Sequence, residues 1–208
     1  MFYLSLDKIR KYAMCPQGPK IIKWFEDRFP EDMDLPLITV FEQFGDVHTV
    51  FCLRAVDGGP EFALDYARDC VKRIQHKFED EFPDNPLFRE CIAVVNLILM
   101  HSTDTLLSSA REAGHNMEVF CNSHHTNTSR KREHAIKAGL SASRLAYAAY
   151  TLKQPHSSVD YSLGAVEEAM DAADNDKLED MWQKSHLESL LMAHKDDEHR
   201  SIGSENKN

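Results

Sequence analysis

The residues best suited to chemistry gather in one polar stretch between apolar segments. Cys121, His124 and His125 lie close together, with His115 before them and His134 after them. Thiolate and imidazole groups are the ligands that zinc prefers in proteins. The stretch from His115 to His134 therefore predicts, as one alternative, a zinc-stabilised protein or a metal-dependent enzyme.

The spacing of these side chains matches no standard metal motif. Cys121 has no partner in a C-x-x-C pair, and Glu112-x-x-His115 is a pair that a di-iron site needs twice on core helices. The plainer interpretation is that residues 115–129 form a long polar loop with exposed histidines. We therefore predict no bound metal and no cofactor.

Other catalytic motifs are missing from the sequence. The chain has no G-x-S-x-G, no Walker loop and no G-x-G-x-x-G, so that neither a serine nucleophile nor nucleotide binding has support. Its five cysteines are odd in number and widely spaced, which indicates a reducing compartment rather than a disulfide scaffold. We predict a non-enzymatic protein in the cytoplasm of a bacterium or of a phage-infected cell.

Negative charge is concentrated towards the end of the chain. Lys+Arg 24 against Asp+Glu 34 gives a formal net charge of −10. An acidic chain repels phosphate, so that direct nucleic-acid binding is not expected. Residues 159–208 hold thirteen acidic residues against five basic ones, and most of the imbalance lies there.

An acidic row and a short basic cluster are the candidate partner-binding features. Glu167, Asp171 and Asp174 follow steps of four and three residues, which places them on one helix face. The row is either a solvated surface or a contact for a basic partner, and it could imitate the phosphate row of a nucleic acid. The cluster Arg130–Arg132 is either a solvated helix end or a contact to an acidic partner. The candidate partner-binding residues are Glu167, Glu168, Asp171, Asp174, Arg130 and Arg132.

The elements that position these residues are predicted to be helices almost throughout. Apolar residues recur at steps of three and four from Phe62 to Phe78, and helical patterns return at 87–101, 130–153 and 178–193. Val47 to Leu53 could form a strand by propensity, but no partner strand is visible and we predict a helix. The expected fold is all-α, a single compact domain of nine or ten short-to-medium helices.

Residues 1–194 are expected to form this domain, with the His-rich loop at 115–129 as its longest connection. Gly114 is expected to stop the helix before that loop. Residues 195–208 are polar and are expected to be a disordered tail. No apolar run approaches the roughly 20 residues of a membrane helix, and the start lacks a signal-peptide pattern, so that no membrane association is predicted.

Several degenerate motifs along most of the chain are similar to those of a known family. They are Phe62–Ala67, Phe82–Pro86, Arg89–Ala93, Ala138–Tyr150 and Trp182–Leu191. With them the chain resembles an alanine-rich, all-helical, immunity-like family of toxin systems in bacteria and phages. The resemblance implies a helical protein that binds a protein partner, and it implies no catalytic residue. The start of the chain, with Cys15, Gly18, Trp24-Phe25 and Phe29-Pro30, is similar to the opening of many small bacterial and phage proteins.

These observations together predict a non-enzymatic, protein-binding inhibitor. Its concrete forms are an immunity-like protein and a phage-encoded anti-defence protein, acting through the acidic helical surface on a partner with a basic surface. One alternative is the metal-dependent or zinc-stabilised protein that uses His115 to His134. The other alternative is a structural or assembly protein that self-associates as a homo-oligomer.

Overall fold

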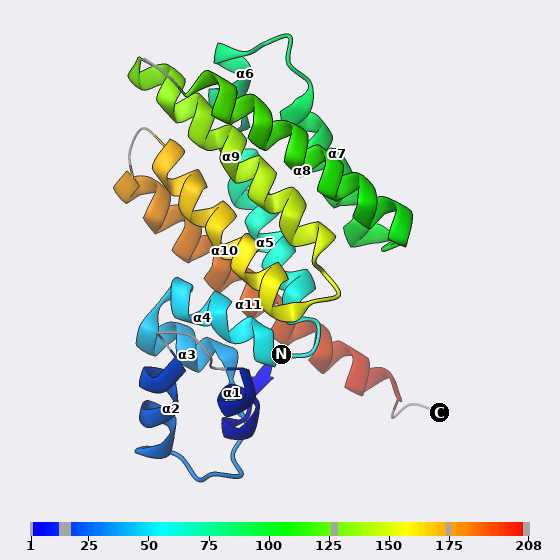
Figure 1. The fold of residues 1–208 in the computed structure, drawn as a ribbon. Helices are drawn as coiled ribbons and strands as arrows, with labels where there is room; N and C mark the ends of the chain where they lie inside the picture. The colour runs from blue at the N-terminus through cyan, green and yellow to red at the C-terminus, as the bar shows by residue number, and fades with distance from the viewer. Residues whose placement is uncertain (1, 13–17, 126–128, 174–175, 206–208) are drawn as a thin grey trace. The chain divides into compact units, whose positions relative to one another are not determined.

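The predicted all-α class is confirmed. The computed structural model describes residues 2–12, 18–125, 129–173 and 176–205, with the backbone alone for Tyr12, Asp176 and 194–205. Within these residues the chain forms eleven α-helices, one 3-10 helix and two strands of two residues each (Figure 1). Where one domain was expected over 1–194, the chain divides into two compact units: Met1–Gly59 with Trp182–Asn208, and Pro60–Met181.

The first unit is built from short helices, a small antiparallel strand pair and the part of the long helix α11 (Asp176–Glu205) that follows Met181. In the pair, Tyr3 lies opposite Pro36 and Leu4 opposite Leu35. The helix predicted over the alternative strand Val47–Leu53 is confirmed, because these residues form α4 and the start of the 3-10 helix η1. The elements are β1 (Tyr3–Leu4), α1 (Leu6–Tyr12), α2 (Gly18–Glu26), β2 (Leu35–Pro36), α3 (Leu37–Phe44), α4 (Asp46–Cys52) and η1 (Leu53–Ala55).

Aromatic rings hold this first unit together. Trp24 lies 5.2 Å from Phe29 and 5.2 Å from Phe44, ring centroid to ring centroid, both edge to face. Phe25 is fully buried and lies 5.6 Å from Phe29. Such edge-to-face pairs add to the free energy that burial of the rings supplies.

The second unit consists of longer helices. α8, α9 and α10 lie side by side with α9 in the middle, and α7 lies beside α8 (Figure 1). The elements are α5 (Gly59–Arg73), α6 (Gln75–Glu81), α7 (Leu87–Met100), α8 (Asp104–His124), α9 (Arg130–Tyr150), α10 (Pro155–Ala172) and the start of α11 (Asp176–Glu205).

The predicted loop over 115–129 is wrong for most of its length, because α8 continues through His124. Gly114 does not end the helix. A Cβ at this position would lie 3.1 Å from the carbonyl oxygen of Ser143, so glycine allows α8 and α9 to approach closely. Residues 126–128 of the predicted loop lie outside the described residues. The buried residues of α8 follow steps of three and four: Leu107, Ala110, Gly114, Met117 and Cys121.

Side-chain hydrogen bonds join the middle helix α9 to both of its neighbouring helices. The hydroxyl of Ser143 donates to the carbonyl oxygen of Gly114 in α8 at 2.8 Å. The hydroxyl of Ser141 donates to the carbonyl oxygen of Ala165 in α10 at 2.6 Å. Both hydroxyls are buried and satisfied, which makes these bonds specific as well as stabilising.

The last helix runs further than the sequence pattern indicated. The backbone of α11 continues to Glu205, beyond the helix expected to end at Ala193. The boundary at 194 and the disorder of residues 195–208 stay predictions. Among the described residues, no helix combines the length and the apolar character needed to cross a membrane.

Candidate functional site

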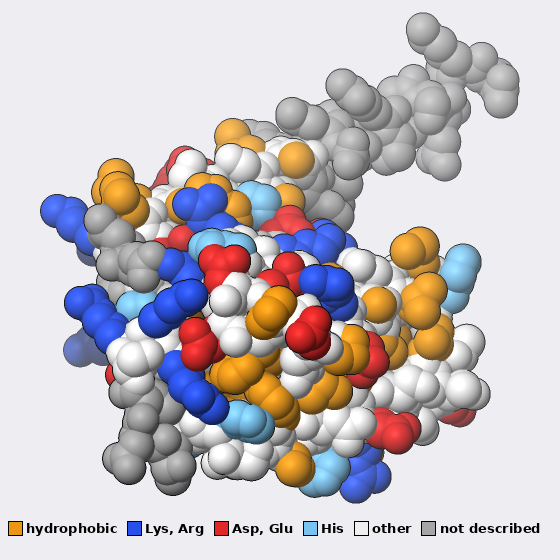
Figure 2. Space-filling view, turned by 90° about the horizontal axis from the view of Figure 1, so that it is seen from above, with side chains coloured by type: hydrophobic (Ala, Val, Ile, Leu, Met, Phe, Trp, Pro, Cys, Tyr) orange, Lys and Arg blue, Asp and Glu red, His pale blue; other side chains and the backbone are white. Residues whose placement is uncertain are grey.

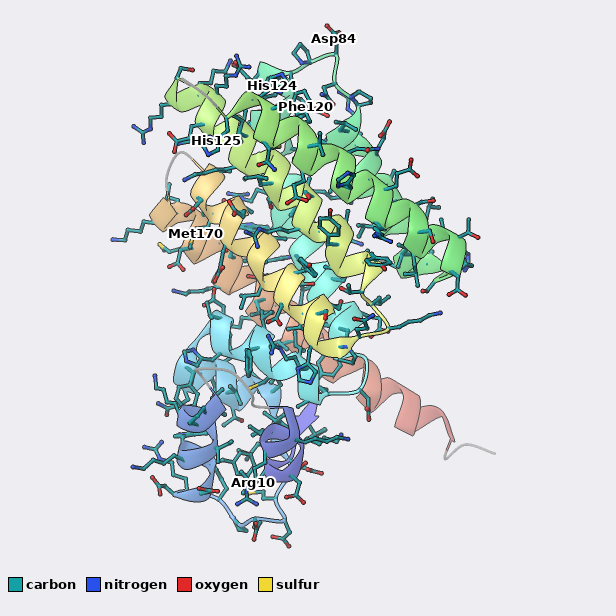
Figure 3. All side chains as sticks on the ribbon, in the orientation of Figure 1. Arg10, Asp84, Phe120, His124, His125 and Met170 are labelled. Atoms are coloured by element: carbon teal, nitrogen blue, oxygen red, sulfur yellow. The ribbon has the colours of Figure 1, made fainter. Side chains whose placement is uncertain are left out.

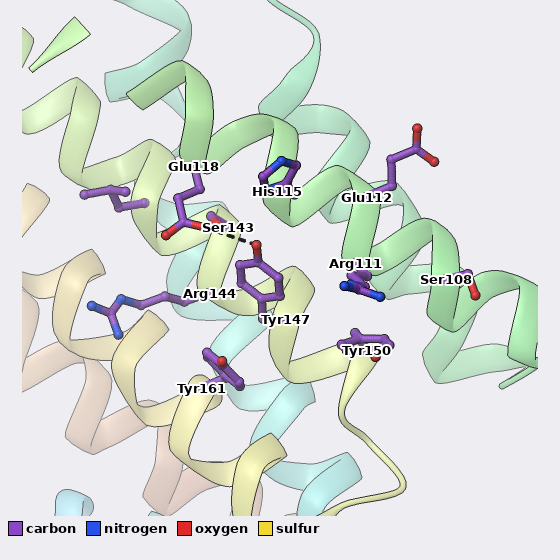
Figure 4. Close-up of a pocket in the computed structure, with 11 residues that line it drawn as sticks. Ser108, Arg111, Glu112, His115, Glu118, Ser143, Arg144, Tyr147, Tyr150 and Tyr161 are labelled. Carbon is purple, nitrogen blue, oxygen red and sulfur yellow. Dashed lines mark hydrogen bonds between the residues drawn. The ribbon is translucent and has the colours of Figure 1, made fainter. Parts of the chain in front are cut away.

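A polar and aromatic groove runs over α8, α9 and α10 of the second unit (Figure 4). Its volume is about 760 Å³, which is in the range of ligand-binding pockets. We name it the tyrosine–arginine groove after its three tyrosines and two arginines. It is lined by Ser108, Arg111, Glu112, His115, Glu118, Leu140, Ser143, Arg144, Tyr147, Tyr150 and Tyr161.

Helical spacing aligns these side chains. Arg111, His115 and Glu118 follow steps of four and three along α8, so that they share one face. Arg144 and Tyr147 are spaced in the same way on α9. The close approach at Gly114 brings the two faces together, and the large side chains beside it line the groove.

Tyr147 lies at the centre of the groove. Its hydroxyl donates to Oε2 of Glu118 at 3.1 Å, and its ring lies 5.5 Å from that of Tyr161. Burial, followed by the bond to Glu118, raises the pKa of Tyr147 to about 12. The phenol therefore stays protonated at neutral pH, so Tyr147 is a hydrogen-bonding group and not a base.

The two arginines of the groove differ in their partners. Arg144 makes an ion pair with Glu168 of α10, with 3.2 Å between Nη2 and Oε1. The guanidinium of Arg111 lies over the ring of Tyr150, 5.6 Å from its centroid. No carboxylate of the described residues forms an ion pair with Arg111, whose cation is held by the face of the Tyr150 ring.

The histidines and the cysteine that suggested a metal site do not converge. His115 lines the groove, whereas Cys121 is buried and donates from Sγ to the carbonyl oxygen of Ile136 at 3.6 Å. His124 stacks on Phe120 with 4.1 Å between ring centroids.

His125 caps the exposed end of α8 (Figure 3). His134 belongs to another hollow, on α6 and α9. Burial raises the pKa of Cys121 to about 12, which disfavours the thiolate that a metal needs. Among the described residues, no three His, Cys, Asp or Glu side chains are placed to share a metal ion.

The acidic row of α10 lies against basic side chains of α9. Glu167 is exposed, while Glu168 pairs with Arg144. Asp171 lies 3.5 Å from Nζ of Lys137, carboxylate oxygen to nitrogen. Asp174 lies outside the described residues. The part of the row that is described is therefore partly neutralised, and it joins the tyrosine–arginine groove at Arg144.

The basic cluster opens α9, as the sequence suggested. The backbone nitrogen of Arg132 donates to the hydroxyl of Ser129, and its guanidinium lies over the ring of Phe82 at 5.5 Å. Arg130 lines a hollow of about 490 Å³ with Lys77 and other residues of α6 and α9. Seen from this end, Lys and Arg side chains gather beside an apolar patch (Figure 2). The acidic row and the basic cluster are thus separate features, with no described contact between their members.

The groove itself was not singled out from the sequence. Tyr147 and Tyr150 fall within the helix predicted over 130–153, and Arg111 precedes Gly114, where the helix was expected to stop. The repeat Arg111, His115, Glu118 was a usable signal, but it becomes a face only if the helix continues past Gly114.

A comparison of the chain with protein-family models, with curated proteins and with solved structures found no match in any of the three. The similarity to immunity-like proteins therefore stays a prediction.

Proposed function

We propose that this protein acts by binding another protein through the tyrosine–arginine groove and the adjoining acidic row. The observation that carries the proposal is the composition of the groove, in which three tyrosines and two arginines lie together. Tyrosine and arginine are enriched among the residues that dominate binding energy at protein interfaces. Tyrosine offers a large rigid surface at low entropic cost, and arginine offers several directed donors.

The acidic row would steer the same partner. Glu167 is exposed and lies on the helix that carries Tyr161 and Glu168. Basic groups of the partner that face Glu167 would accelerate association without contributing much to final affinity. The partner would thus be basic opposite the row, as expected from the charge of this part of the sequence.

The biological role that fits such binding is inhibition, as in an immunity-like or phage-encoded anti-defence protein. The resemblance of the sequence motifs supports this role. Cytoplasmic residence is part of the proposal, and it is supported by the buried thiols of Cys91 and Cys121, which are typical of a reducing compartment.

Site-specific photocrosslinking in the native host tests the binding surface. Benzoylphenylalanine replaces Tyr161 in the groove, 37% exposed, or Leu97 on α7, 47% exposed and outside the groove lining. Because both positions are accessible, a difference between them reports location. We expect a protein adduct of defined mass from position 161 and none from position 97.

The partner is then identified by mass spectrometry, purified, and assayed with and without one equivalent of this protein. Stoichiometric loss of the partner's activity is the result expected for an inhibitor. Equal adducts from both positions, or none from position 161, would contradict the proposed surface.

A further inference from the structure

Arg111 differs from the other arginine of the groove because it forms no ion pair with a carboxylate in the described part of the chain. The guanidinium lies over the ring of Tyr150, and no ion pair is formed with Glu112 or Glu118, which line the same groove. A ring face orients a guanidinium and leaves its N–H edges open to an acceptor.

Arg144 provides the contrast within the same groove. Its Nη2 lies 3.2 Å from the carboxylate of Glu168, so that part of its hydrogen-bonding capacity is already used. Figure 4 shows the two arginines on opposite sides of Tyr147. An incoming anion would therefore meet one compensated and one uncompensated guanidinium.

The charge of the lining selects the kind of anion. The groove contains Glu112 and Glu118 as well as the arginines. These carboxylates repel a dianionic phosphate more strongly than a singly charged carboxylate, and a carboxylate matches the guanidinium edge in a bidentate pair. The lining tyrosines offer flat walls to the side chains that flank such a carboxylate.

We infer that the tyrosine–arginine groove receives an acidic segment of the partner protein, with an Asp or Glu carboxylate bound to Arg111 beside Tyr150. This inference rests on the proposed function and names the chemistry of the partner at that surface. The partner then presents a carboxylate to the groove and basic groups to Glu167.

The test uses the full-length protein and a random linear heptapeptide library displayed on phage. Selected peptides are synthesised, and their affinities are measured by fluorescence anisotropy against the wild type, Arg111→Gln and Arg144→Gln. We expect the selected peptides to share an Asp or Glu, and we expect Arg111→Gln to weaken binding by about tenfold, as loss of a charged hydrogen-bonded pair does. Arg144→Gln, the matched control, should weaken it less than about threefold.

A second comparison isolates the pair. Replacing the shared acidic residue of the peptide by its amide should weaken binding to the wild type by the same factor as Arg111→Gln does. The replacement should hardly change binding to Arg111→Gln itself, because the guanidinium that pairs with the carboxylate is already gone. Both variants are surface substitutions, and their thermal unfolding is compared with that of the wild type.

The inference is overturned by selected peptides without acidic residues, by a failure to enrich any peptide, or by equal effects of the two arginine variants. Tighter binding of the peptide with phosphoserine in place of the acidic residue would also overturn the preference for a carboxylate. Its failure is separable from that of the proposed function: an adduct at position 161 that persists in Arg111→Gln leaves the binding surface intact and removes only the carboxylate anchor.

Discussion

Both units contain clusters of aromatic rings, with Phe78 against Phe88 and Phe120 in the second unit, but the units differ in how their helices approach one another. In the first unit, short helices are held by rings, with Trp24, Phe25, Phe29 and Phe44 in edge-to-face contact. In the second unit, α9 meets α8 and α10 through glycine, serine and alanine, and hydroxyls bond directly to backbone carbonyls of the neighbouring helices.

This difference explains why the candidate site lies on the second unit. A seam of small residues brings helix backbones together, so that large side chains on the same helices are left along its edge. Tyr147 and Arg144 are such side chains on α9, and Arg111 is one on α8. In the first unit Phe25 is fully buried, whereas Trp24, Phe29 and Phe44 are half-buried.

Removal of a ring from the first unit should have the largest effect. Phe25→Ala empties a fully buried position between Trp24 and Phe29 and should lower the free energy of unfolding by about 3–5 kcal/mol. Urea unfolding followed by circular dichroism measures this change. Met33→Ala, at a position 41% exposed, is the control and should change it by less than about 0.5 kcal/mol. A loss below about 1 kcal/mol for Phe25→Ala would show that burial of this ring contributes little to the stability of the unit.

The next largest loss of stability is expected when a single methyl group is added to the seam of the second unit. A Cβ on Gly139 would lie 2.5 Å from Sγ of Cys121 and 3.1 Å from Sδ of Met117, so Gly139→Ala should cost about 1–3 kcal/mol by overpacking.

Cys121→Ala should recover part of that cost, because it removes the nearest clashing atom. Gly164→Ala provides the matched control. A Cβ there meets the flexible end of Arg144, and its effect should simply add to that of Cys121→Ala. Additive behaviour at Gly139 as well would argue against close packing of this seam.

The half-buried phenol of the groove should give a smaller, pH-dependent effect. The pKa of Tyr147 is about 12 in the folded protein and about 10 in an unfolded chain, so the folded state holds this proton more tightly. The resulting stability is fully present below pH 10 and is lost as the pH rises through 12. Because solvent screens a half-buried group, the loss should be about 1 kcal/mol.

Free energies of unfolding measured from pH 9 to 12 should therefore fall more steeply for the wild type than for Tyr147→Phe. Parallel curves would mean that folding does not raise the pKa of this phenol.

The mildest effect is expected at the acidic row, which contributes long-range charge and no packing. Glu167→Lys should slow association with the crosslinked partner about two- to threefold at low salt, since steering acts on the association rate. Glu90→Lys on the exposed surface of α7 gives the same change of net charge and should leave the rate almost unchanged. Stopped-flow measurements at low and high salt give the association rates. Equal rates for the two variants would show that the acidic row does not steer the partner.

Features set by neighbouring residues could be predicted from the sequence. Helix starts are such features: the side-chain oxygens of Ser5, Thr103 and Ser129 each accept a bond from the backbone nitrogen three residues later. These bonds depend on spacing within one turn, which a sequence displays directly.

Features that depend on distant residues could not be predicted. Gly114 has the same local signature whether it ends a helix or permits a close approach, and the choice depends on Ser143, 29 residues later in the chain. The groove depends on the same alignment, because Glu118 and Tyr147 are also 29 residues apart. The division into two units was likewise not predicted. Gly58-Gly59-Pro60 interrupts the helical pattern there, but such a break has the same local sequence between two helices of one unit as between two units.

The two hydrogen bonds from Ser141 and Ser143 to the neighbouring helices also limit how α9 can change in length. Inserting one residue turns everything beyond it by about 100° around the helix axis. An insertion before Ser141 would move both hydroxyls away from the carbonyls of Gly114 and Ala165 and would turn Tyr147 out of the groove. Variation in chain length among homologues should therefore fall outside α9, while substitutions at exposed positions of α9 are tolerated.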